Sequence, residues 1–377
     1  MVNILYFHNS SLISGGERSL LALWKSIDRV RFNPIALLPG EGPLAEEARK
    51  LRIKVYVFCV PRIYPWVTWG LIKAVRKLSG IVVEEKISLI HSYSPRNNAI
   101  AWWVGKRKHI AVIWHERNLI YGRERDVTRD LLKWPQAVIC NSQAVAARFL
   151  IQGRLPDKVR VILNGVDCLE FTPADDKESA KASFGWQGKI IVGLVSHLGE
   201  RKGVETFLEI AELVSRARKD VFFVVVGGEY NGSPDRLSAL KRYAQSLGLS
   251  DKVFWSGFQI DVGTYLKAFD VACNVTEKEA CSRSILEAMA AGVPVAAFAD
   301  GGTPELVVDG ETGILVTPGD KKMFASRLAE LLEHHDVRLR LGAGGRARAQ
   351  NLFDVKINAE KTMALYDELL EKKGQVR

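Results

Sequence analysis

The chain has 377 residues, which is too long for a single hydrophobic core and predicts two domains of ordinary size. It contains no run of about eighteen uncharged apolar residues to span a membrane and no basic leader with a cleavage site. Its five cysteines form no CxxC pair, so we expect a cytoplasmic protein without an obvious zinc site. Residues 1–185 hold 28 Lys and Arg against 17 Asp and Glu, and residues 186–377 hold 25 against 26, so the whole positive excess lies in the first half.

The first half alternates short apolar runs with amphipathic helices. The first strand, at 4–7, is followed by a loop at 8–16 and a helix at 17–27. Further strands are predicted at 34–38, 55–59, 89–91, 111–114 and 137–140. Successive strands separated by helices predict a parallel sheet with right-handed crossovers.

The same pattern begins again after a linker at about residues 172–188. Strands are predicted at 190–195, 221–226, 253–255, 271–274, 295–298 and 314–316. The predicted fold class is therefore α/β, with two doubly wound, Rossmann-like domains at 1–184 and 185–356 and a cleft between them. A helix at about 357–377 is expected to return to the first domain, and the glycine run at 342–345 is predicted to end a helix.

Three loops have features of a diphosphate site. In the first, Gly15 and Gly16 precede a helix, so backbone amides and the positive end of the helix dipole would point into the loop. In the second, Arg201 and Lys202 stand just before a helix, where cations oppose the dipole unless an anion lies between them. If the ligand is a sugar nucleotide, cleavage of the sugar leaves a negatively charged diphosphate, which needs cations or a metal to stabilise it. The chain has no Asp-x-Asp pair to hold a metal. An ordinary tight turn and a solvated pair are the structural alternatives.

A third loop, at 279–284, precedes an apolar helix and places two glutamates eight positions apart. Glu279 is expected to accept hydrogen bonds from sugar hydroxyls and Glu287 from a ribose. The small residues between them would let backbone amides approach a ligand. The alternative is an acid that complements the helix dipole, followed by a solvated glutamate.

The sequence resembles the retaining glycosyltransferases of family 4, which have the GT-B fold of two facing Rossmann-like domains. The resemblance covers nearly the whole chain, and its most specific part is the Glu-x7-Glu block of Glu279 and Glu287 with the trailing Gly292 and Pro294. The other matching elements are Gly15-Gly16-Glu17, Asn164-Gly165-Val166-Asp167 with Phe171 and Pro173, Lys202-Gly203, Gly227-Gly228, and Gly301-Gly302 with Glu305.

The resemblance implies transfer of a sugar from a nucleoside diphosphate to a saccharide or lipid-linked acceptor, with retention at the anomeric carbon and without a metal or other cofactor. The departing phosphate would take the acceptor's proton, and the product would belong to a cell-surface polysaccharide or glycolipid. The residues implied in catalysis are Glu279, His115, Lys202 and Arg201, and those implied in donor binding are Gly15, Gly16, His197, Gly228, Phe258, Ala280, Cys281, Ser282, Arg283, Ser284 and Glu287.

The chain departs from the family pattern at two places. Ser196 and His197 stand where the family often has Gly-Arg, so part of the phosphate clamp is expected to move to Arg201. Residues 280–282, Ala-Cys-Ser, stand where the family often has Gly-Phe-Gly, which leaves the donor sugar open.

Two segments of the basic first half combine tryptophan with lysine and arginine. Residues 61–80 contain Trp66 and Trp69 among Lys73, Arg76 and Lys77, and residues 102–108 begin with two tryptophans and end with three basic residues. This composition suits the interface of an anionic membrane. An ordinary helix that packs its apolar face on the sheet is the alternative.

Other functions fit the same composition less well. A sugar-nucleotide epimerase would use the same fold and interconvert the donor without an acceptor, and a phosphorylase would need a pyridoxal lysine and a much longer chain. A nucleic-acid-binding protein would use the basic first half, but the chain has no RNA-binding aromatic motif or helix-turn-helix pattern, so no nucleic acid is expected as a partner.

Overall fold

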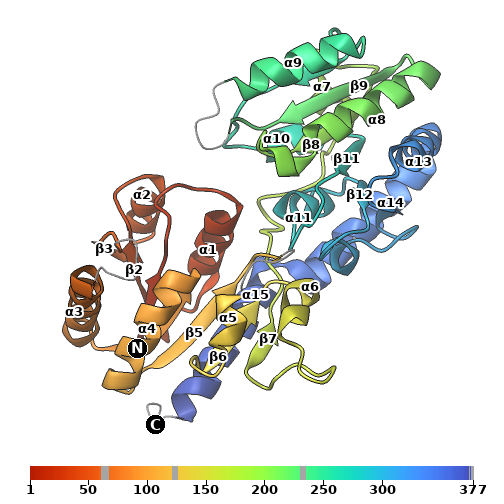
Figure 1. Ribbon diagram of the computed structural model, residues 1–377. Coiled ribbons are helices and arrows are strands. Elements are labelled where there is room, and N and C mark those ends of the chain that lie inside the picture. The colour runs from red at the N-terminus through yellow and green to blue at the C-terminus, as the bar shows by residue number, and fades with distance from the viewer. Residues whose placement is uncertain (61–67, 121–125, 230–234, 373, 375–377) are drawn as a thin grey trace. The chain divides into compact units, whose positions relative to one another are not determined.

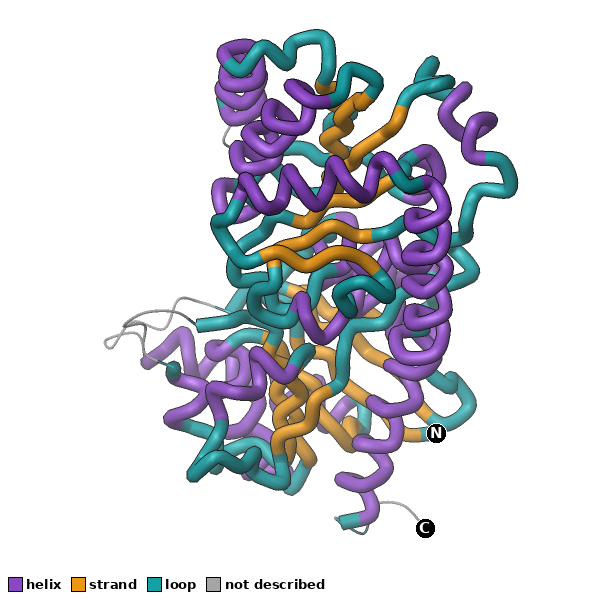
Figure 2. The backbone as a smooth tube through the Cα atoms, turned by 90° about the vertical axis from the view of Figure 1, so that its right-hand side faces the viewer, coloured by secondary structure: helices purple, strands orange, loops and turns teal. Residues whose placement is uncertain are grey.

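The computed structural model describes residues 1–60, 68–120, 126–229, 235–372 and 374, and divides the chain into two compact units (Figure 1). Unit 1 consists of Met1–Gly165 with Val355–Arg377, and unit 2 of Val166–Asp354. In each unit, helices enclose a sheet whose strands are all parallel (Figure 2). Burial on both faces explains why the strands are continuously apolar.

Unit 1 contains a seven-stranded sheet in the order β3-β2-β1-β4-β5-β6-β7. Its strands are β1 (Val2–Phe7), β2 (Phe32–Leu38), β3 (Lys54–Val57), β4 (Ile87–Tyr93), β5 (Ala111–Glu116), β6 (Ala137–Cys140) and β7 (Val159–Val161). Its helices are α1 (Gly15–Ser26), α2 (Pro43–Lys50), α3 (Thr68–Glu84), α4 (Pro95–Lys108), α5 (Val127–Asp130), α6 (Gln143–Ala146) and α15 (Val355–Glu371).

Unit 2 contains a six-stranded sheet in the order β10-β9-β8-β11-β12-β13. Its strands are β8 (Ile190–Val195), β9 (Val221–Val226), β10 (Val253–Trp255), β11 (Val271–Asn274), β12 (Val295–Phe298) and β13 (Gly313–Val316). Its helices are α7 (Lys177–Ala182), α8 (Val204–Ala217), α9 (Arg236–Ser246), α10 (Gly263–Ala268), α11 (Arg283–Ala290), α12 (Thr303–Leu306), α13 (Lys321–Glu333) and α14 (His335–Arg348).

The C-terminal helix α15 is part of the core of unit 1. Its Tyr366 and Leu370 are fully buried in the same apolar cluster as Trp24 of α1. Asn358 donates a hydrogen bond of 2.6 Å to the carbonyl oxygen of Leu163, and Arg31 pairs with Asp367 at 2.5 Å. Residues that follow all of unit 2 in the sequence therefore complete the first unit.

Residues 166–184, which the sequence assigns to the first domain, lie in unit 2. These residues belong to unit 2 because α7 is bonded to Phe269 and Asp270, the two residues just before β11. The Lys181 ammonium lies 2.9 Å from Asp270, and Lys177 donates a hydrogen bond of 2.6 Å to the carbonyl oxygen of Phe269. The segment that looks like a linker in the sequence therefore contains a short packed helix, α7.

The glycine run at 342–345 does not end a helix, and that prediction is wrong. These residues lie inside α14, where the helix crosses two other backbone segments. A side chain at Gly342 would collide with the carbonyl oxygen of Gly292, and one at Gly344 with that of Glu311. The glycines therefore permit close helix packing rather than a turn.

We predict that Gly342→Ala destabilises unit 2 by about 1–3 kcal/mol, because the added methyl group forces the two backbones apart. Gly345→Ala is the matched control, since its new methyl group would meet its nearest neighbour at an ordinary 3.5 Å. That control should be neutral or stabilising by up to about 1 kcal/mol, the usual helix preference for alanine. Urea unfolding followed by circular dichroism measures both, and equal midpoints for the two variants would contradict the close-packing account.

Candidate functional site

The strand order of unit 2 reverses between β8 and β11. β9 and β10 extend the sheet on one side of β8, whereas β11, β12 and β13 extend it on the other. The loops at 196–203 and 275–282, which follow β8 and β11, therefore leave neighbouring strand ends in opposite directions. An open α/β sheet binds its ligands in the crevice at such a reversal.

Lys202 and Glu279 come from these two loops and form an ion pair. The Lys202 ammonium lies 2.7 Å from a carboxylate oxygen of Glu279, and both side chains are largely buried. Gly203, which follows Lys202 with a φ of 69°, makes the approach possible. A side chain there would come within 2.6 Å of the Val275 carbonyl oxygen. The glycine thus allows the loop after β8 to pass close to the loop after β11.

The backbone around Glu279 is tied to the turn that follows β12. The Gly302 amide donates a hydrogen bond of 2.8 Å to the carbonyl oxygen of Glu279. The Lys278 amide donates one of 2.6 Å to the Asp300 carboxylate, with Lys278 itself at a φ of 60°. These two contacts hold the Glu279 side chain at the strand reversal.

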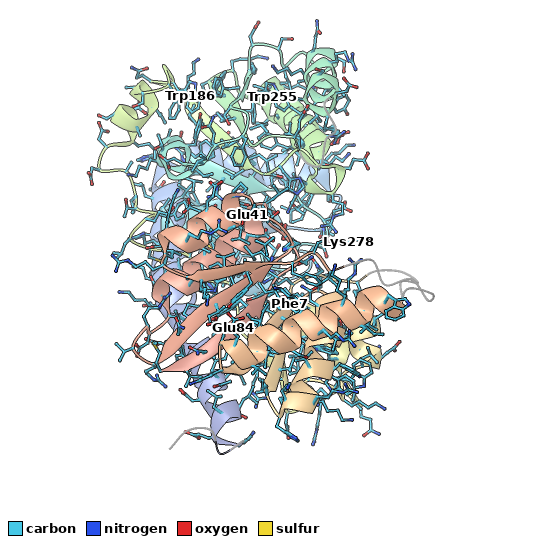
Figure 3. The ribbon with its side chains drawn as sticks, turned by 90° about the vertical axis from the view of Figure 1, so that its left-hand side faces the viewer. Phe7, Glu41, Glu84, Trp186, Trp255 and Lys278 are labelled. Carbon is cyan, nitrogen blue, oxygen red and sulfur yellow. The ribbon has the colours of Figure 1, made fainter. Side chains whose placement is uncertain are left out.

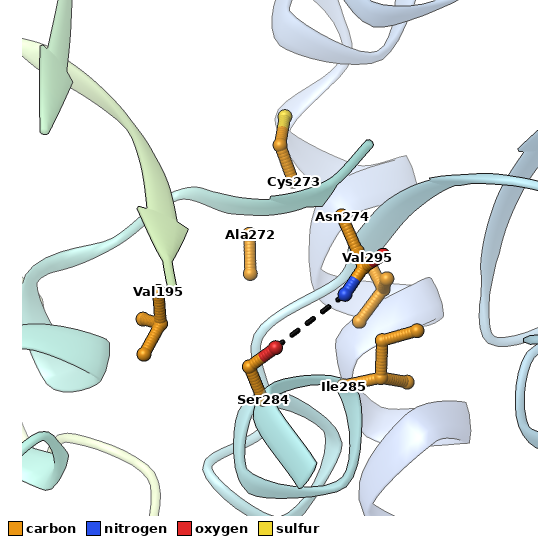
Figure 4. Close-up of a pocket in the computed structure, with 7 residues that line it drawn as sticks. All are labelled: Val195, Ala272, Cys273, Asn274, Ser284, Ile285 and Val295. Carbon is orange, nitrogen blue, oxygen red and sulfur yellow. Dashed lines mark hydrogen bonds between the residues drawn. The ribbon is translucent and has the colours of Figure 1, made fainter. Parts of the chain in front are cut away.

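The start of α11 is anchored to the end of β11. Asn274 donates hydrogen bonds to the hydroxyls of Ser282, at 3.0 Å, and Ser284, at 3.5 Å. Figure 4 shows the second of these contacts in a small pocket between β8, β11 and α11. Ala280 and Cys281 are buried in the loop just before the helix.

Glu287 is not a solvated side chain, which removes the structural alternative considered for it. It is 5% exposed and pairs with Arg283, one turn earlier on α11, at 2.9 Å. Arg283 is thus its direct partner. The two glutamates of the Glu-x7-Glu block each have a cationic partner, Lys202 for Glu279 and Arg283 for Glu287.

His197 lies in the loop after β8 and is neutral near pH 7. Burial, with the nearby charges of Lys202 and Arg201, lowers its pKa to about 4. Its Nδ1 accepts a hydrogen bond of 3.0 Å from the Gly199 amide, so the ring proton lies on Nε2. The family often has an arginine at this position, whereas this chain has a neutral imidazole whose Nε2 can donate a hydrogen bond. Arg201 is exposed beside it.

Gly228 and Phe258 lie together on the β9–β10 side of the reversal. The amide of Gly227 donates a hydrogen bond of 3.0 Å to the carbonyl oxygen of Gly257, which joins the two turns. A side chain at Gly228 would meet Phe258 at 2.8 Å. The Phe258 side chain is 66% exposed, so its ring is accessible to a flat ligand group.

In unit 1 the strand order reverses between β1 and β4, and α1 begins after β1. Glu17 accepts hydrogen bonds from the backbone amide and the hydroxyl of Ser14, which caps the helix. Arg117 donates a hydrogen bond to the carbonyl oxygen of Gly16. The start of α1, with Gly15 and Gly16, is thereby attached to the segment after β5.

His115, the last residue but one of β5, lies within a cluster of aromatic rings. Its ring stacks on those of His91 and Tyr93, and His8 lies against Tyr93 with ring centroids 4.8 Å apart. Burial, with the charge of Arg117, lowers the pKa of His115 well below its usual value. Its Nε2 is buried and has no hydrogen-bond partner in the described part of the chain. A ligand that reached this atom would complete its hydrogen bonding.

Sequence reasoning missed the neighbours of His115 in this cluster, namely His8, His91, Tyr93 and Arg117. Their positions could have revealed them. His8 and Arg117 directly follow β1 and β5, and His91 and Tyr93 lie in the last three residues of β4. The carboxyl ends of neighbouring parallel strands meet at one edge of the sheet.

The described parts of the tryptophan-rich segments lie on α3 and α4, two helices of unit 1 in contact with each other. Val75 and Leu78 of α3 are buried, whereas Trp69 is 80% exposed beside the exposed Leu71 and Ile72. Figure 3 shows α3 at the front of unit 1, with Glu84 at its C-terminal end. A set of exposed apolar and basic residues on these two helices is called the α3–α4 surface. It consists of Trp69, Leu71, Ile72, Lys73, Arg76, Lys77, Lys106, Arg107 and Lys108.

Part of the predicted membrane segment, residues 61–67 with Trp66, lies outside the described residues. On α4, Trp102 stacks on Trp134 at 4.1 Å, and the Arg107 guanidinium lies 3.6 Å from the Trp103 ring centre. Trp102 is thus engaged within the protein, while Trp103 is partly exposed. In the described ranges, every helix is too short or too polar to cross a membrane.

Two family models together match most of the chain. The model described as Glycosyltransferase Family 4 matches residues 13–169, and the model described as Glycosyl transferases group 1 matches residues 176–348. The chain belongs to glycosyltransferase family 4. The predicted family and the predicted enzyme class, a glycosyltransferase, are thereby confirmed.

Relatives agree with this family. The lipopolysaccharide core biosynthesis mannosyltransferase LpsB of Rhizobium meliloti is 27% identical over 68% of this chain and 80% of its own length. A D-inositol 3-phosphate glycosyltransferase of Corynebacterium jeikeium is 31% identical over 56% of this chain, but the match spans only 52% of that protein.

The fold is that of solved glycosyltransferases. HepE of Anabaena, crystallised with UDP, has a TM-score of 0.85 at 24% identity, over 97% of this chain and 100% of that one. Sucrose-phosphate synthase of Thermosynechococcus elongatus has a TM-score of 0.80 at 21% identity, over 99% and 100% of the two chains. The predicted GT-B fold, with two Rossmann-like units, is confirmed.

We predict that His197 makes this family member less stable in acid. Its pKa in the folded state, about 4, lies below the 6.5 of an unperturbed histidine, so protonation favours the unfolded chain. The stability present above pH 6.5 is lost as the pH falls toward 4. His197→Asn keeps an acceptor for the Gly199 amide but cannot be protonated. Its urea midpoint should fall less than the wild-type midpoint between pH 6.5 and 4.

The control for this prediction is His335→Gln, which replaces an exposed histidine. This variant should follow the wild-type pH dependence. Parallel curves for His197→Asn and wild type would show that His197 is not the group that titrates.

Proposed function

We propose that this glycosyltransferase uses a nucleoside-diphosphate sugar and transfers the sugar, with retention, to a saccharide or lipid-linked acceptor. The observation that carries the proposal is the Lys202–Glu279 pair at the strand reversal of unit 2. Crystals of HepE contain UDP and UDP-glucose, which supports a nucleotide sugar as donor. The likeness to LpsB, a lipopolysaccharide core mannosyltransferase, supports a role in making a cell-surface polysaccharide or glycolipid.

In this proposal Lys202 and Arg201 stabilise the departing diphosphate. Negative charge grows on the phosphate as the bond to the sugar breaks, and a fixed cation in a partly buried site stabilises it more than one in water. Glu279 holds Lys202 in place before the donor binds and then accepts hydrogen bonds from the sugar hydroxyls. Glu287, fixed by Arg283, binds the ribose, while Gly228 and Phe258 lie near the base.

The proposed reaction needs no metal, because side-chain cations carry the diphosphate charge. The departing phosphate oxygen takes the proton of the acceptor hydroxyl on the face that the phosphate leaves, which gives retention. His115 of unit 1 contributes a hydrogen bond to the donor sugar, and the amides of Gly15 and Gly16 contribute to binding the phosphate.

We predict that Lys202→Ala and Glu279→Gln each lower turnover by about 100-fold or more. The first removes a cation that stabilises the departing diphosphate, and the second removes the carboxylate that positions this cation and accepts hydrogen bonds from the sugar. Donor hydrolysis is measured with UDP-glucose, UDP-N-acetylglucosamine and GDP-mannose. Lys241→Ala is the control, because it removes an exposed lysine of α9. Wild-type hydrolysis in both site variants, with any donor that the wild type hydrolyses, would reject the proposed site.

We also propose that unit 1 docks on an anionic membrane through the α3–α4 surface. Exposed Trp69, Leu71 and Ile72 can enter the headgroup region, while the basic residues of the same surface attract anionic lipid. Charge complementarity favours this partner, because the positive excess of the chain lies entirely in its first half. A lipid-linked acceptor would be presented at such a surface.

We predict that the protein co-sediments with vesicles of phosphatidylglycerol and phosphatidylcholine, and only weakly with pure phosphatidylcholine. The triple variant Trp69→Ser, Lys73→Gln, Lys77→Gln should bind about tenfold more weakly or worse, since each surface cation contributes about 1 kcal/mol. The double variant Lys241→Gln, Arg242→Gln removes two exposed charges from unit 2 and should bind like wild type. Equal binding by the triple variant, or equal binding to both vesicles, would contradict membrane docking.

A further inference from the structure

Four side chains of unit 1 form a continuous chain of hydrogen bonds that ends at His115. The hydroxyl of Tyr6 on β1 lies 3.1 Å from the hydroxyl of Tyr366 on α15. The Tyr366 hydroxyl lies 2.6 Å from Nδ1 of His91, and Nε2 of His91 lies 3.0 Å from Nδ1 of His115. Tyr6, His91 and Tyr366 are fully buried.

Each of the four groups has one proton to donate. Burial is the main cause that lowers the pKa of His91 and of His115 well below the usual value, and the charge of Arg117 adds to it. Both histidines are therefore neutral near pH 7. Burial also raises the pKa of Tyr366 well above its usual value, so its hydroxyl is protonated. The direction of the bonds is then a matter of counting protons and acceptors.

In one direction, Tyr6 donates to Tyr366, Tyr366 donates to Nδ1 of His91, and Nε2 of His91 donates to Nδ1 of His115. Three protons are then used, and the fourth lies on Nε2 of His115, which has no partner in the described residues. This arrangement leaves one unpaired polar group, at the end of β5.

In the opposite direction, the proton of Tyr6 has no acceptor, because Tyr366 is its hydrogen-bond partner in the described part of the chain. Nε2 of His115 would at the same time be an acceptor without a donor. Two buried polar groups are then unpaired. In a mixed arrangement, Tyr6 and His91 would both donate to the hydroxyl oxygen of Tyr366. The proton of Tyr366 would then be unpaired in place of the proton of Tyr6. An unmade buried hydrogen bond is unfavourable, so the first direction is preferred.

We propose that Tyr366 and His91 are positioning residues that hold His115 in the tautomer with its proton on Nε2. The inference rests on the proposed function for the role of His115, but the tautomer is a property of the free protein. His115 then presents a hydrogen-bond donor, so the ligand atom it contacts is an acceptor such as a sugar hydroxyl or phosphate oxygen. A helix from the C-terminal end of the chain thereby sets the chemistry of a residue in the first unit.

The tautomer is measured in the full chain labelled with 15N-histidine, by long-range proton–nitrogen correlation spectra near pH 7. The chain has only seven histidines, and loss of one signal set in His115→Gln identifies that of His115. We expect a protonated Nε2 and an unprotonated Nδ1 for His115 in the wild type. A protonated Nδ1 would overturn the proposal without any further variant.

Two tyrosine variants test which hydroxyl sets the tautomer. Tyr366→Phe removes the donor to Nδ1 of His91, so the nitrogen shifts of His115 should move toward an average of the two tautomers. Tyr6→Phe is the matched control, because Tyr366 still donates to His91 and the shifts of His115 should stay at wild-type values. Wild-type shifts in a folded Tyr366→Phe variant, or averaged shifts in Tyr6→Phe alone, would overturn the proposal.

Activity separates this proposal from the proposed function. With the donor that the wild type hydrolyses, Tyr366→Phe should lower kcat/KM about threefold to tenfold, the value of one hydrogen bond, whereas Tyr6→Phe should leave it unchanged. Full activity of His115→Gln together with the expected tautomer would refute the role of His115 in transfer and leave the tautomer assignment standing. The unexpected tautomer would refute the assignment whatever the activity.

Discussion

The chemistry of this chain depends on one constraint, the reversal of strand order between β8 and β11. Loops that leave two neighbouring strands in opposite directions open a space at the strand ends, and residues from both loops border it. Gly203 lets the two loops approach each other, so Lys202 meets Glu279. The carboxylate keeps the lysine in position while no anion is bound. Moving either loop would separate a cation from the place where the phosphate charge is proposed to develop.

Unit 1 has a reversal of the same kind, between β1 and β4, but its strand ends carry mainly neutral rings, with Arg117 as a neighbouring cation. Burial keeps His8, His91 and His115 largely uncharged at neutral pH. Six of the exposed cations in the described part of this unit lie on the α3–α4 surface. In the proposed function, unit 2 supplies charge to a diphosphate, and unit 1 supplies directed hydrogen bonds and a basic outer surface.

Much of this fold could be predicted from the sequence, and the failures have physical causes. In unit 2, β8, β9 and β11 match their predicted bounds because buried parallel strands are short apolar runs between turn residues. β7 has only three residues and was missed. The run at 342–345 was misinterpreted because a glycine that permits helix packing has the same letters as one that ends a helix. The motif predicted Lys202 and Glu279, whereas the contact of His91 with Tyr366 joins positions 275 residues apart and has no local signal.

The central claim is that side-chain cations of unit 2, and not a metal ion, hold the diphosphate. Calorimetric titration of the wild-type protein with UDP and with GDP, once in excess EDTA and once in excess magnesium, tests it most directly. The account predicts that at least one of the two nucleotides binds, and binds with the same affinity under both conditions. Binding that appears only when magnesium is present would contradict it.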